Sequence, residues 1–245
     1  MSSSDQNASE QAIGTLTEEG IKSQLDTVES LSVDIETDPM KLTQGQVDKV
    51  LIKGRGMVIQ NDLRTEELTF ETGAVDIAML KLPFGKVELE HPTEAKAKVI
   101  LKPEDIQKAF NADYVKQKLR GQKIELSGNT LTTDASNVCF TIPEPGRIAL
   151  SADVMLIEKV ETNHVEFSAR PELINDGFSV TLKDVKIAQE KNDSPELTKT
   201  LIKNTQELLD LRFFELEGMN LQFEKMAVES DRIVIKASAK VTSFD

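Results

Sequence analysis

The stretch of sequence that decides the fold is Leu82–Ile106, which reads LPFGKVELEHPTEAKAKVILKPEDI. It holds an apolar tip with a glycine turn, a short strand that ends at His91-Pro92, a second strand and a helix start. Apolar residues recur at every second position of the second strand: Ala95, Ala97, Val99 and Leu101. Because strand side chains alternate between two faces, this pattern predicts an antiparallel strand with one buried and one wet face.

The same alternation recurs on both sides of this stretch. It covers several segments before and after it: Val50 with Ile52, Leu68 with Phe70, Val75 with Ile77 and Met79, Ile148 to Leu156, Val165 to Ala169, and Ile233 to Val241. These segments follow one another too closely for βαβ units. The sequence therefore predicts an α+β protein with an antiparallel sheet.

In two places the alternation shifts by one residue within a predicted strand, after Leu182 and after Phe223. A shift of this kind is typical of a β-bulge, which bends the strand that carries it. The two shifts predict a strongly curved sheet.

Helices are predicted at three places. The first begins at the capping box of Thr15 and Glu18, the second at Pro103, and the third at Ser194-Pro195. The second helix should break near Asn111-Ala112-Asp113 and end at Gly121. Residues 1–14 are predicted to be a disordered polar tail. Because no shift in composition marks a boundary, residues 15–245 are predicted to form a single domain.

Charge excludes some classes of partner. The chain has 42 acidic and 29 basic residues, a net charge of −13. Nucleic acid is therefore not expected as a partner, because affinity for it comes mostly from basic side chains. The single cysteine, Cys139, excludes an internal disulfide and a multi-cysteine metal site. It lies in an apolar run, which predicts a buried, inert thiol.

No recognised catalytic motif stands in the sequence. The two histidines, His91 and His164, have no second histidine or cysteine at ligand spacing, and each is predicted to have a solvent-facing structural role. The Gly54-Arg55-Gly56 segment lies between predicted strands and indicates a turn or bulge rather than a phosphate site. We therefore expect no catalysis, no cofactor and no bound metal.

Two dense apolar clusters remain as candidate binding residues. The first comprises Ile77, Met79, Leu80, Leu82 and Phe84, and the second comprises Leu208, Leu209, Phe213 and Phe214 with the neighbouring Leu211. Either cluster can be ordinary core, or it can line a groove that holds an acyl chain, since methionine and phenylalanine adapt to irregular apolar ligands. Each CH₂ buried in such a groove is worth about 0.8 kcal/mol.

Three segments resemble the LmeA-like family of bacterial phospholipid-binding proteins, in the branch common in cyanobacteria. They are Leu82–Ile106, Leu208–Met219 and Ile233–Ala239. The resemblance implies a fold like the tubular lipid-binding proteins of the BPI and SMP type, in which a strongly curved antiparallel sheet wraps around long helices. It also implies phospholipid binding, and it assigns no residue to a lipid headgroup.

From the residues and the resemblance together, we expect non-catalytic binding or transfer of a phospholipid or another acyl-chain lipid, with transient membrane contact. The main alternative is a protein-interaction scaffold with a filled core and no ligand. A further alternative is a hydrolase, for which the sequence offers only scattered carboxylates. The basic segment at Lys116, Lys118, Arg120 and Lys123 is either a headgroup contact or a solvated helix end. The N-terminus lacks the pattern of a secretory signal. A cytoplasmic or membrane-peripheral location is therefore expected, and a periplasmic one only after removal of a leader.

Overall fold

The structure is a computed structural model, and it describes residues 3–59, 63–78, 88–113, 116–117, 120–174, 177–188, 194–208 and 219–243. The chain divides into two compact units. Unit 1 comprises Met1–Ile100, Phe214–Lys225 and Ile235–Asp245, and unit 2 comprises Leu101–Phe213 and Met226–Val234. Each unit is described here by itself.

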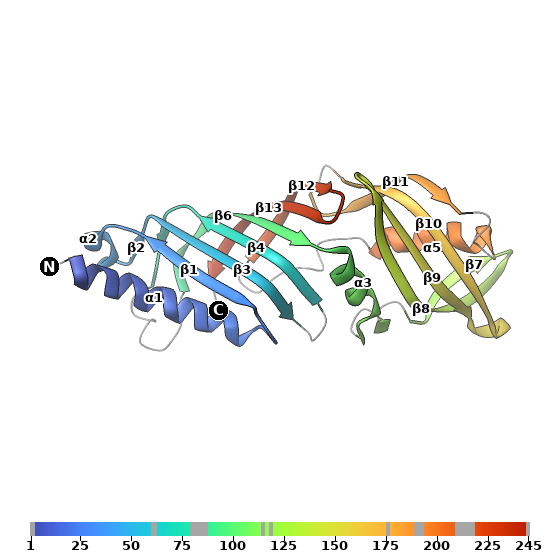
Figure 1. Cartoon of the computed structure of the whole chain (residues 1–245), viewed down its shortest axis with the longest axis horizontal. Helices are drawn as coiled ribbons and strands as arrows, with labels where there is room; N and C mark the ends of the chain where they lie inside the picture. The colour runs from blue at the N-terminus through green and yellow to red at the C-terminus, as the bar shows by residue number, and fades with distance from the viewer. Residues whose placement is uncertain are drawn as a thin grey trace. The chain divides into compact units, whose positions relative to one another are not determined.

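Unit 1 is built on a six-stranded sheet with the strand order β1-β3-β4-β6-β13-β12 (Figure 1). Its strands are β1 (Ser30–Glu36), β3 (Lys49–Ile59), β4 (Leu63–Thr72), β6 (Glu88–Leu101), β12 (Met219–Val228) and β13 (Ile233–Ser243). A two-stranded sheet joins β2 (Gln46–Val47) to β5 (Val75–Asp76), and the helices are α1 (Ser3–Ser23) and α2 (Pro39–Leu42).

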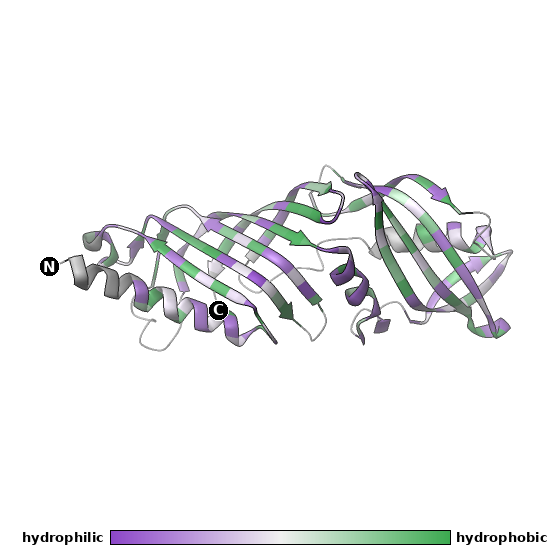
Figure 2. Ribbon diagram, in the orientation of Figure 1, coloured by the Kyte–Doolittle hydropathy of each residue, from purple (hydrophilic) through white to green (hydrophobic). Residues whose placement is uncertain are grey.

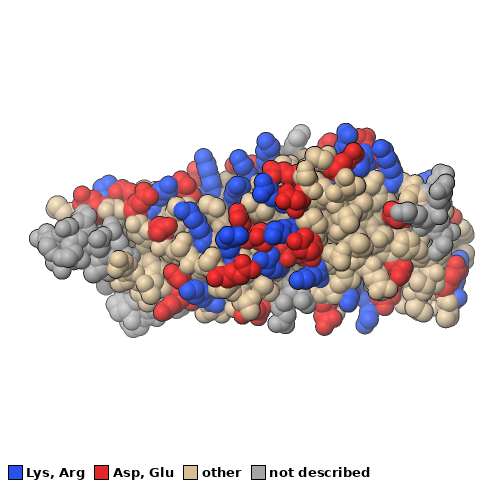
Figure 3. All heavy atoms as spheres, in the orientation of Figure 1, with Lys and Arg blue, Asp and Glu red and all other residues tan. Residues whose placement is uncertain are grey.

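The two faces of this sheet differ as the alternation predicts. On β3, Val50 and Ile52 are buried, whereas Lys53 and Arg55 are exposed. Figure 2 shows the same alternation of hydropathy along the strands. Acidic and basic side chains are interspersed over the charged face (Figure 3), where Lys49 pairs with Glu71 at 3.1 Å. The buried face packs with Ile13 and Ile21 of α1, and it forms one apolar core.

Unit 2 contains a five-stranded antiparallel sheet with the strand order β11-β10-β9-β8-β7. Its strands are β7 (Gln122–Leu126), β8 (Asn129–Glu144), β9 (Arg147–Leu156), β10 (Glu161–Leu173) and β11 (Val180–Ile187). The 3₁₀ turn η2 (Ile157–Lys159) joins β9 to β10. Helix α3 (Pro103–Asn111) packs against β8, and α5 (Pro195–Leu208) packs against β7, β10 and β11.

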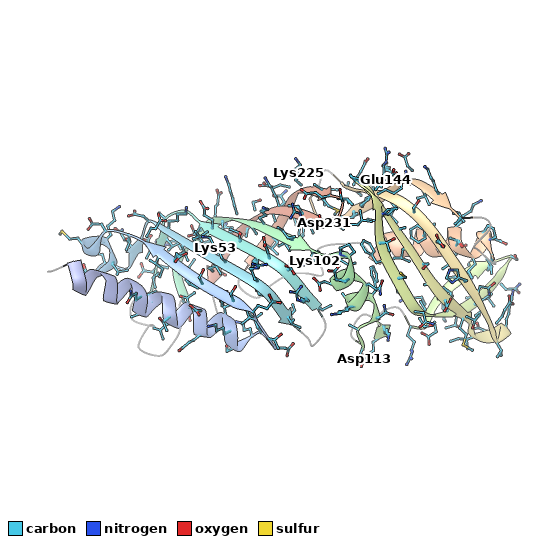
Figure 4. All side chains as sticks on the ribbon, viewed as in Figure 1. Lys53, Lys102, Asp113, Glu144, Lys225 and Asp231 are labelled. Carbon is cyan, nitrogen blue, oxygen red and sulfur yellow. The ribbon has the colours of Figure 1, made fainter. Side chains whose placement is uncertain are left out.

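Helix α3 is close to its predicted form. It begins at Pro103 and ends before Ala112, which lies in the segment where a break was predicted. Lys102 and Asp113, which flank the helix, are labelled in Figure 4. Farther along the chain, Arg120 donates its backbone N–H to the Lys116 carbonyl, and Gly121 has a φ of +72°. The left-handed glycine is the predicted stop of this helical segment.

One of the two predicted bulges is confirmed. Along β10, Ser168 pairs with Lys186 and Arg170 pairs with Lys183, so β11 carries one extra residue. Asp184 in this bulge has a φ of +47°. Two register shifts in β8, between Ser136 and Cys139 and between Thr141 and Glu144, were not predicted. The predicted bulge in β12 stays a prediction.

Two glycines and a proline that were predicted to end strands lie inside them. β3 runs through Gly54 and Gly56, and β6 runs through Pro92. Gly56 has a φ of +56°, and a Cβ there would come within 2.3 Å of the Glu29 side chain. On the β4 side of β6, the described pairs end at Ala95, so Pro92 takes no part in that ladder.

The fold class is confirmed in its coarse form. The described residues form mostly antiparallel strands and few helices, which agrees with the predicted α+β class and its antiparallel sheet. A sheet wrapped around several long helices is not supported: α1 has 21 residues, but α3 has 9 and α5 has 14. Helix α1 begins at Ser3, within the segment predicted as a tail. The single domain over residues 15–245 stays a prediction.

Candidate lipid-binding surface

Most of the predicted site residues lie outside the described residues: Met79, Leu80, Leu82, Phe84, Leu209, Phe213 and Phe214. Ile77 is described and is buried in the core of unit 1. Its backbone N–H donates to the Gly45 carbonyl at 2.7 Å, and it forms an isolated bridge with Leu89. Leu208 is the last residue of α5. The role of all nine residues in lipid binding stays a prediction.

The helix α5, which ends at Leu208, packs on one face of the sheet in unit 2, and this face is apolar. We call it the inner face. We define the inner face by the strand residues that alternate toward α5. Its buried residues join two clusters that include α5: Leu197 lies in one with Val154 and Val165, and Ile202 lies in the other with Phe167. The fully buried Leu197 fixes the first turn of α5 on the sheet.

The inner face is not uniformly buried. Several of its apolar side chains are only partly buried against the two clusters: Ala135, Ile148, Leu150 and Ile187. Leu150 packs against both clusters and lies opposite Phe140 on one neighbouring strand and Phe167 on the other. A row of partly buried leucine and isoleucine residues beside buried phenylalanines is the kind of surface that an acyl chain covers.

Helix α3 closes one side of this surface and is pinned to β8. The Asn111 side chain donates to the Val138 carbonyl at 2.7 Å and accepts from the Val138 N–H at 3.2 Å. The Phe110 ring stacks on the Phe140 ring with 6.4 Å between their centroids. Both contacts fix the position of α3, and Phe110 packs against the inner face.

One polar group on the inner face has no partner. Asn163 of β10 is 4% exposed, and its Nδ2 is buried without a hydrogen-bond acceptor. Leaving such a donor unpaired costs about 1–3 kcal/mol, so buried polar groups in folded proteins are nearly always paired. An acceptor supplied by a bound molecule would remove this cost. No signal in the sequence distinguishes Asn163 from an ordinary strand residue.

The outer face of the same sheet is polar. His164 Nδ1 lies 2.9 Å from the Asp153 carboxylate, which also accepts from Asn137 Nδ2 at 2.9 Å. The bonds from Asn137 and then from His164 lower the pKa of Asp153 from its ordinary value. His91 is exposed, as predicted. Cys139 is also exposed, so its predicted burial is wrong: Val138 and Phe140 point inward, and the residue between them must point outward.

Two residues of the basic segment interact with acidic groups of the protein. Arg120 Nε lies 3.3 Å from the Asp134 carboxylate, and the Lys123 charge acts on Glu158. Lys118 lies outside the described residues. The role of the segment, as a headgroup contact or as a solvated helix end, stays a prediction.

Over the described ranges, no group of three or more His, Cys, Asp or Glu side chains could hold a metal ion. Among the same residues, no helix has the length and apolar character needed to cross a membrane.

Comparison with known proteins gives one match. The family described as LmeA-like phospholipid-binding matches residues 9–238, which is most of the chain. No curated protein and no solved structure shows significant similarity to this chain. The match extends across both units and agrees with the three segments on which the resemblance was based. The chain therefore belongs to the LmeA-like phospholipid-binding family.

Proposed function

We propose that this protein binds a phospholipid, or another lipid with acyl chains, without catalysis, and that the acyl chains lie on the inner face of unit 2. The observation that carries the proposal is the partly buried row of Ile148, Leu150 and Ile187 beside the buried Phe167. Family membership supports the class of ligand. Covering apolar side chains by an acyl chain supplies binding energy without polar contacts.

Asn163 gives the proposal a polar element. Its buried Nδ2 lacks an acceptor within the protein, and a phospholipid carries ester carbonyl oxygens at the head of each acyl chain. One hydrogen bond from Asn163 to such an oxygen would satisfy the donor and fix how far the chains enter. Transfer of the lipid and a peripheral location at the membrane, with transient contact, are part of the proposal.

The first test is native mass spectrometry of the purified protein before and after solvent extraction. We expect a bound mass in the phospholipid range that extraction removes and that added phospholipid restores. A protein that carries no lipid and takes none up would reject the proposal and favour the scaffold alternative.

A matched pair of variants tests the location. Leu150 points to the inner face and Ala149, its neighbour in β9, points to the outer face opposite Ser168. Leu150→Asp should abolish the bound mass, whereas Ala149→Asp should retain it, because only the first places a charge against the acyl chains. Ile187→Asp, near the end of β11, serves if Leu150→Asp does not fold. Lipid retention by folded Leu150→Asp and Ile187→Asp would reject the inner face as the site.

A further inference from the structure

An apolar tip projects from unit 2 where β9 turns through η2 into β10. We call residues 155–160 the η2 tip. Among the described residues, seven large apolar side chains are exposed, and three of them belong to this tip. Met155 is 38% exposed, Ile157 is 44% exposed and Val160 is 80% exposed. Single exposed apolar residues are ordinary, but a cluster at one turn indicates an interaction surface.

Val160 has an unusual backbone for its type. Its φ is +53° and its ψ is +39°, which is the left-handed conformation. A β-branched residue is strained there, and glycine or asparagine would be favoured. The strain does not serve the core, since the Val160 side chain is the most exposed of the seven. Strain of this kind persists mainly where the side chain is used.

The turn that carries these side chains is held in place. Glu158, between the apolar residues, accepts a hydrogen bond from the Thr132 backbone N–H at 2.7 Å and one from the Thr132 hydroxyl at 2.6 Å. Thr132 is paired in turn with Lys123 of β7. The acidic group of the turn is therefore bound to the sheet, and Ile157 and Val160 are presented by a fixed backbone.

The charge of the tip is balanced. Lys159 and Lys123 lie beside Glu158, and Glu161 follows Val160. The chain as a whole carries −13, so an anionic surface would repel most of the molecule, whereas a zwitterionic surface would not. Lysine can also bury its aliphatic stem while its ammonium group stays among headgroups.

We propose that the η2 tip inserts into the interfacial layer of a phospholipid bilayer and docks the protein there for lipid exchange. The proposal rests on the proposed function, since it supplies the membrane contact that lipid uptake or delivery needs. Ile157 and Val160 enter the acyl boundary, Met155 lies at the headgroup level, and Lys159 reaches the phosphates. Insertion of the apolar side chains dominates the contact, and Lys159 adds a single exposed charge, so binding should depend only weakly on salt.

The chain has no tryptophan, so a single introduced tryptophan reports on its own position. Val160→Trp is the probe, and Ile174→Trp is the matched control because Ile174 is 46% exposed and follows the opposite end of β10. On phosphatidylcholine vesicles, Val160→Trp emission should shift to the blue and be quenched by brominated acyl chains. Ile174→Trp should show neither change. Unshifted Val160→Trp emission, or an equal shift of both probes, would overturn the proposal.

A loss-of-function pair makes the test independent of the probe. Ile157→Asp with Val160→Asp should weaken cosedimentation with phosphatidylcholine vesicles about tenfold or more. Met40→Asp, at a residue that is 74% exposed in α2 of unit 1, should leave it unchanged. Unchanged cosedimentation of the double variant would reject the η2 tip as the site of membrane docking.

Native mass spectrometry of the same preparations separates this proposal from the proposed function. If the wild-type protein holds lipid while its η2 tip stays outside the bilayer, docking through the tip is rejected and lipid binding is not. A tip that inserts while the protein holds no lipid would support the tip and reject the proposed function.

Discussion

The Glu158 carboxylate accepts both hydrogen bonds that Thr132 can donate, from its backbone N–H at 2.7 Å and from its hydroxyl at 2.6 Å. Thr132 lies in β8 and Glu158 in η2, so this pair fixes the turn against the sheet. The hydroxyl bond first, and the backbone bond second, lower the pKa of Glu158 below its ordinary value of 4.5.

This pair predicts a pH dependence at the η2 tip. Because the pKa of Glu158 is lower in the folded protein, its stabilising contribution is present at neutral pH. It is lost as the pH falls below 4.5 and through the folded pKa. The Thr132 amide resonance in NMR spectra should shift in that acidic range. In Glu158→Gln, the Thr132 amide resonance should not shift in this pH range. A wild-type resonance that stays constant over the same range would contradict the hydrogen bonds between Glu158 and Thr132.

Replacement of Val160 separates stability from membrane docking. Val160→Gly should raise the free energy of unfolding by about 1 kcal/mol, because glycine adopts the left-handed conformation without strain. The same change should weaken vesicle binding. Thermal unfolding and cosedimentation measure the two effects.

Asp184→Gly is the matched control for Val160→Gly, since Asp184 is also left-handed, with a φ of +47°, but lies in the β11 bulge. It should leave vesicle binding unchanged. A Val160→Gly variant that binds vesicles as well as the wild type would show that the side chain has no docking role.

Asn163 predicts a preference between lipids. The wild type should bind a diacyl phospholipid more tightly than the dialkyl ether phospholipid with the same headgroup and chain length, because the ether lacks the ester carbonyl acceptors. Asn163→Leu should lose this preference while it retains affinity for the ether lipid. Titration of both lipids against both proteins gives the difference in binding free energy between the ester and ether lipids for each protein. We expect this difference to be larger in the wild type than in Asn163→Leu by about 1 kcal/mol. An equal preference in both proteins would remove Asn163 from the site.

Two arginines at the β11 bulge should differ in their effect on stability. Arg147 is 5% exposed, and its Nη1 donates to the Asp184 carbonyl at 2.9 Å. Arg170 is an exposed partner of the Asp184 carboxylate at 3.4 Å. Arg147→Met should lower the free energy of unfolding by about 1–3 kcal/mol, because it leaves the bulge carbonyl without its donor. Arg170→Met should change it by less than about 1 kcal/mol. Equal losses in urea unfolding would contradict this assignment.

The sequence predicted the strands well because one buried face makes the alternation visible. β3, β9 and β13 follow from it, and the shift after Leu182 located the bulge at Asp184. The bulge in β8 between Ser136 and Cys139 has a weaker signal. Inward positions shift there from Leu131 and Ala135 to Val138 and Phe140, but the polar Thr133, Ser136 and Asn137 interrupt the apolar alternation and hide the shift.

Residues that usually end strands misled the sequence prediction where the local backbone tolerates them. Pro92 lies beyond the last described pair of β6 with β4, and Gly56 lies in β3 with a φ of +56°, which glycine adopts without strain. Cys139 was predicted to be buried from the apolar character of its neighbours alone. In a strand the neighbours of an exposed residue are the buried ones.

The candidate site was less predictable than the fold. Apolar density identified single segments of sequence, but the inner face combines side chains from β8, β9, β10 and β11 beneath α5, and only the strand pairing brings them together. The unpaired amide of Asn163 and the left-handed backbone of Val160 depend on tertiary structure and turn geometry. Neither property has a counterpart in composition or periodicity.

The central claim is that acyl chains lie on the inner face of unit 2, and photocrosslinking tests it most directly. A phospholipid with a diazirine at the end of one acyl chain is loaded, irradiated and mapped by mass spectrometry of the digested protein. We predict adducts on the inner-face residues Ile148, Leu150 and Phe167 and on α5. Adducts confined to the outer-face residues Ala149, Ser151 and Ser168, or to unit 1, would contradict the claim.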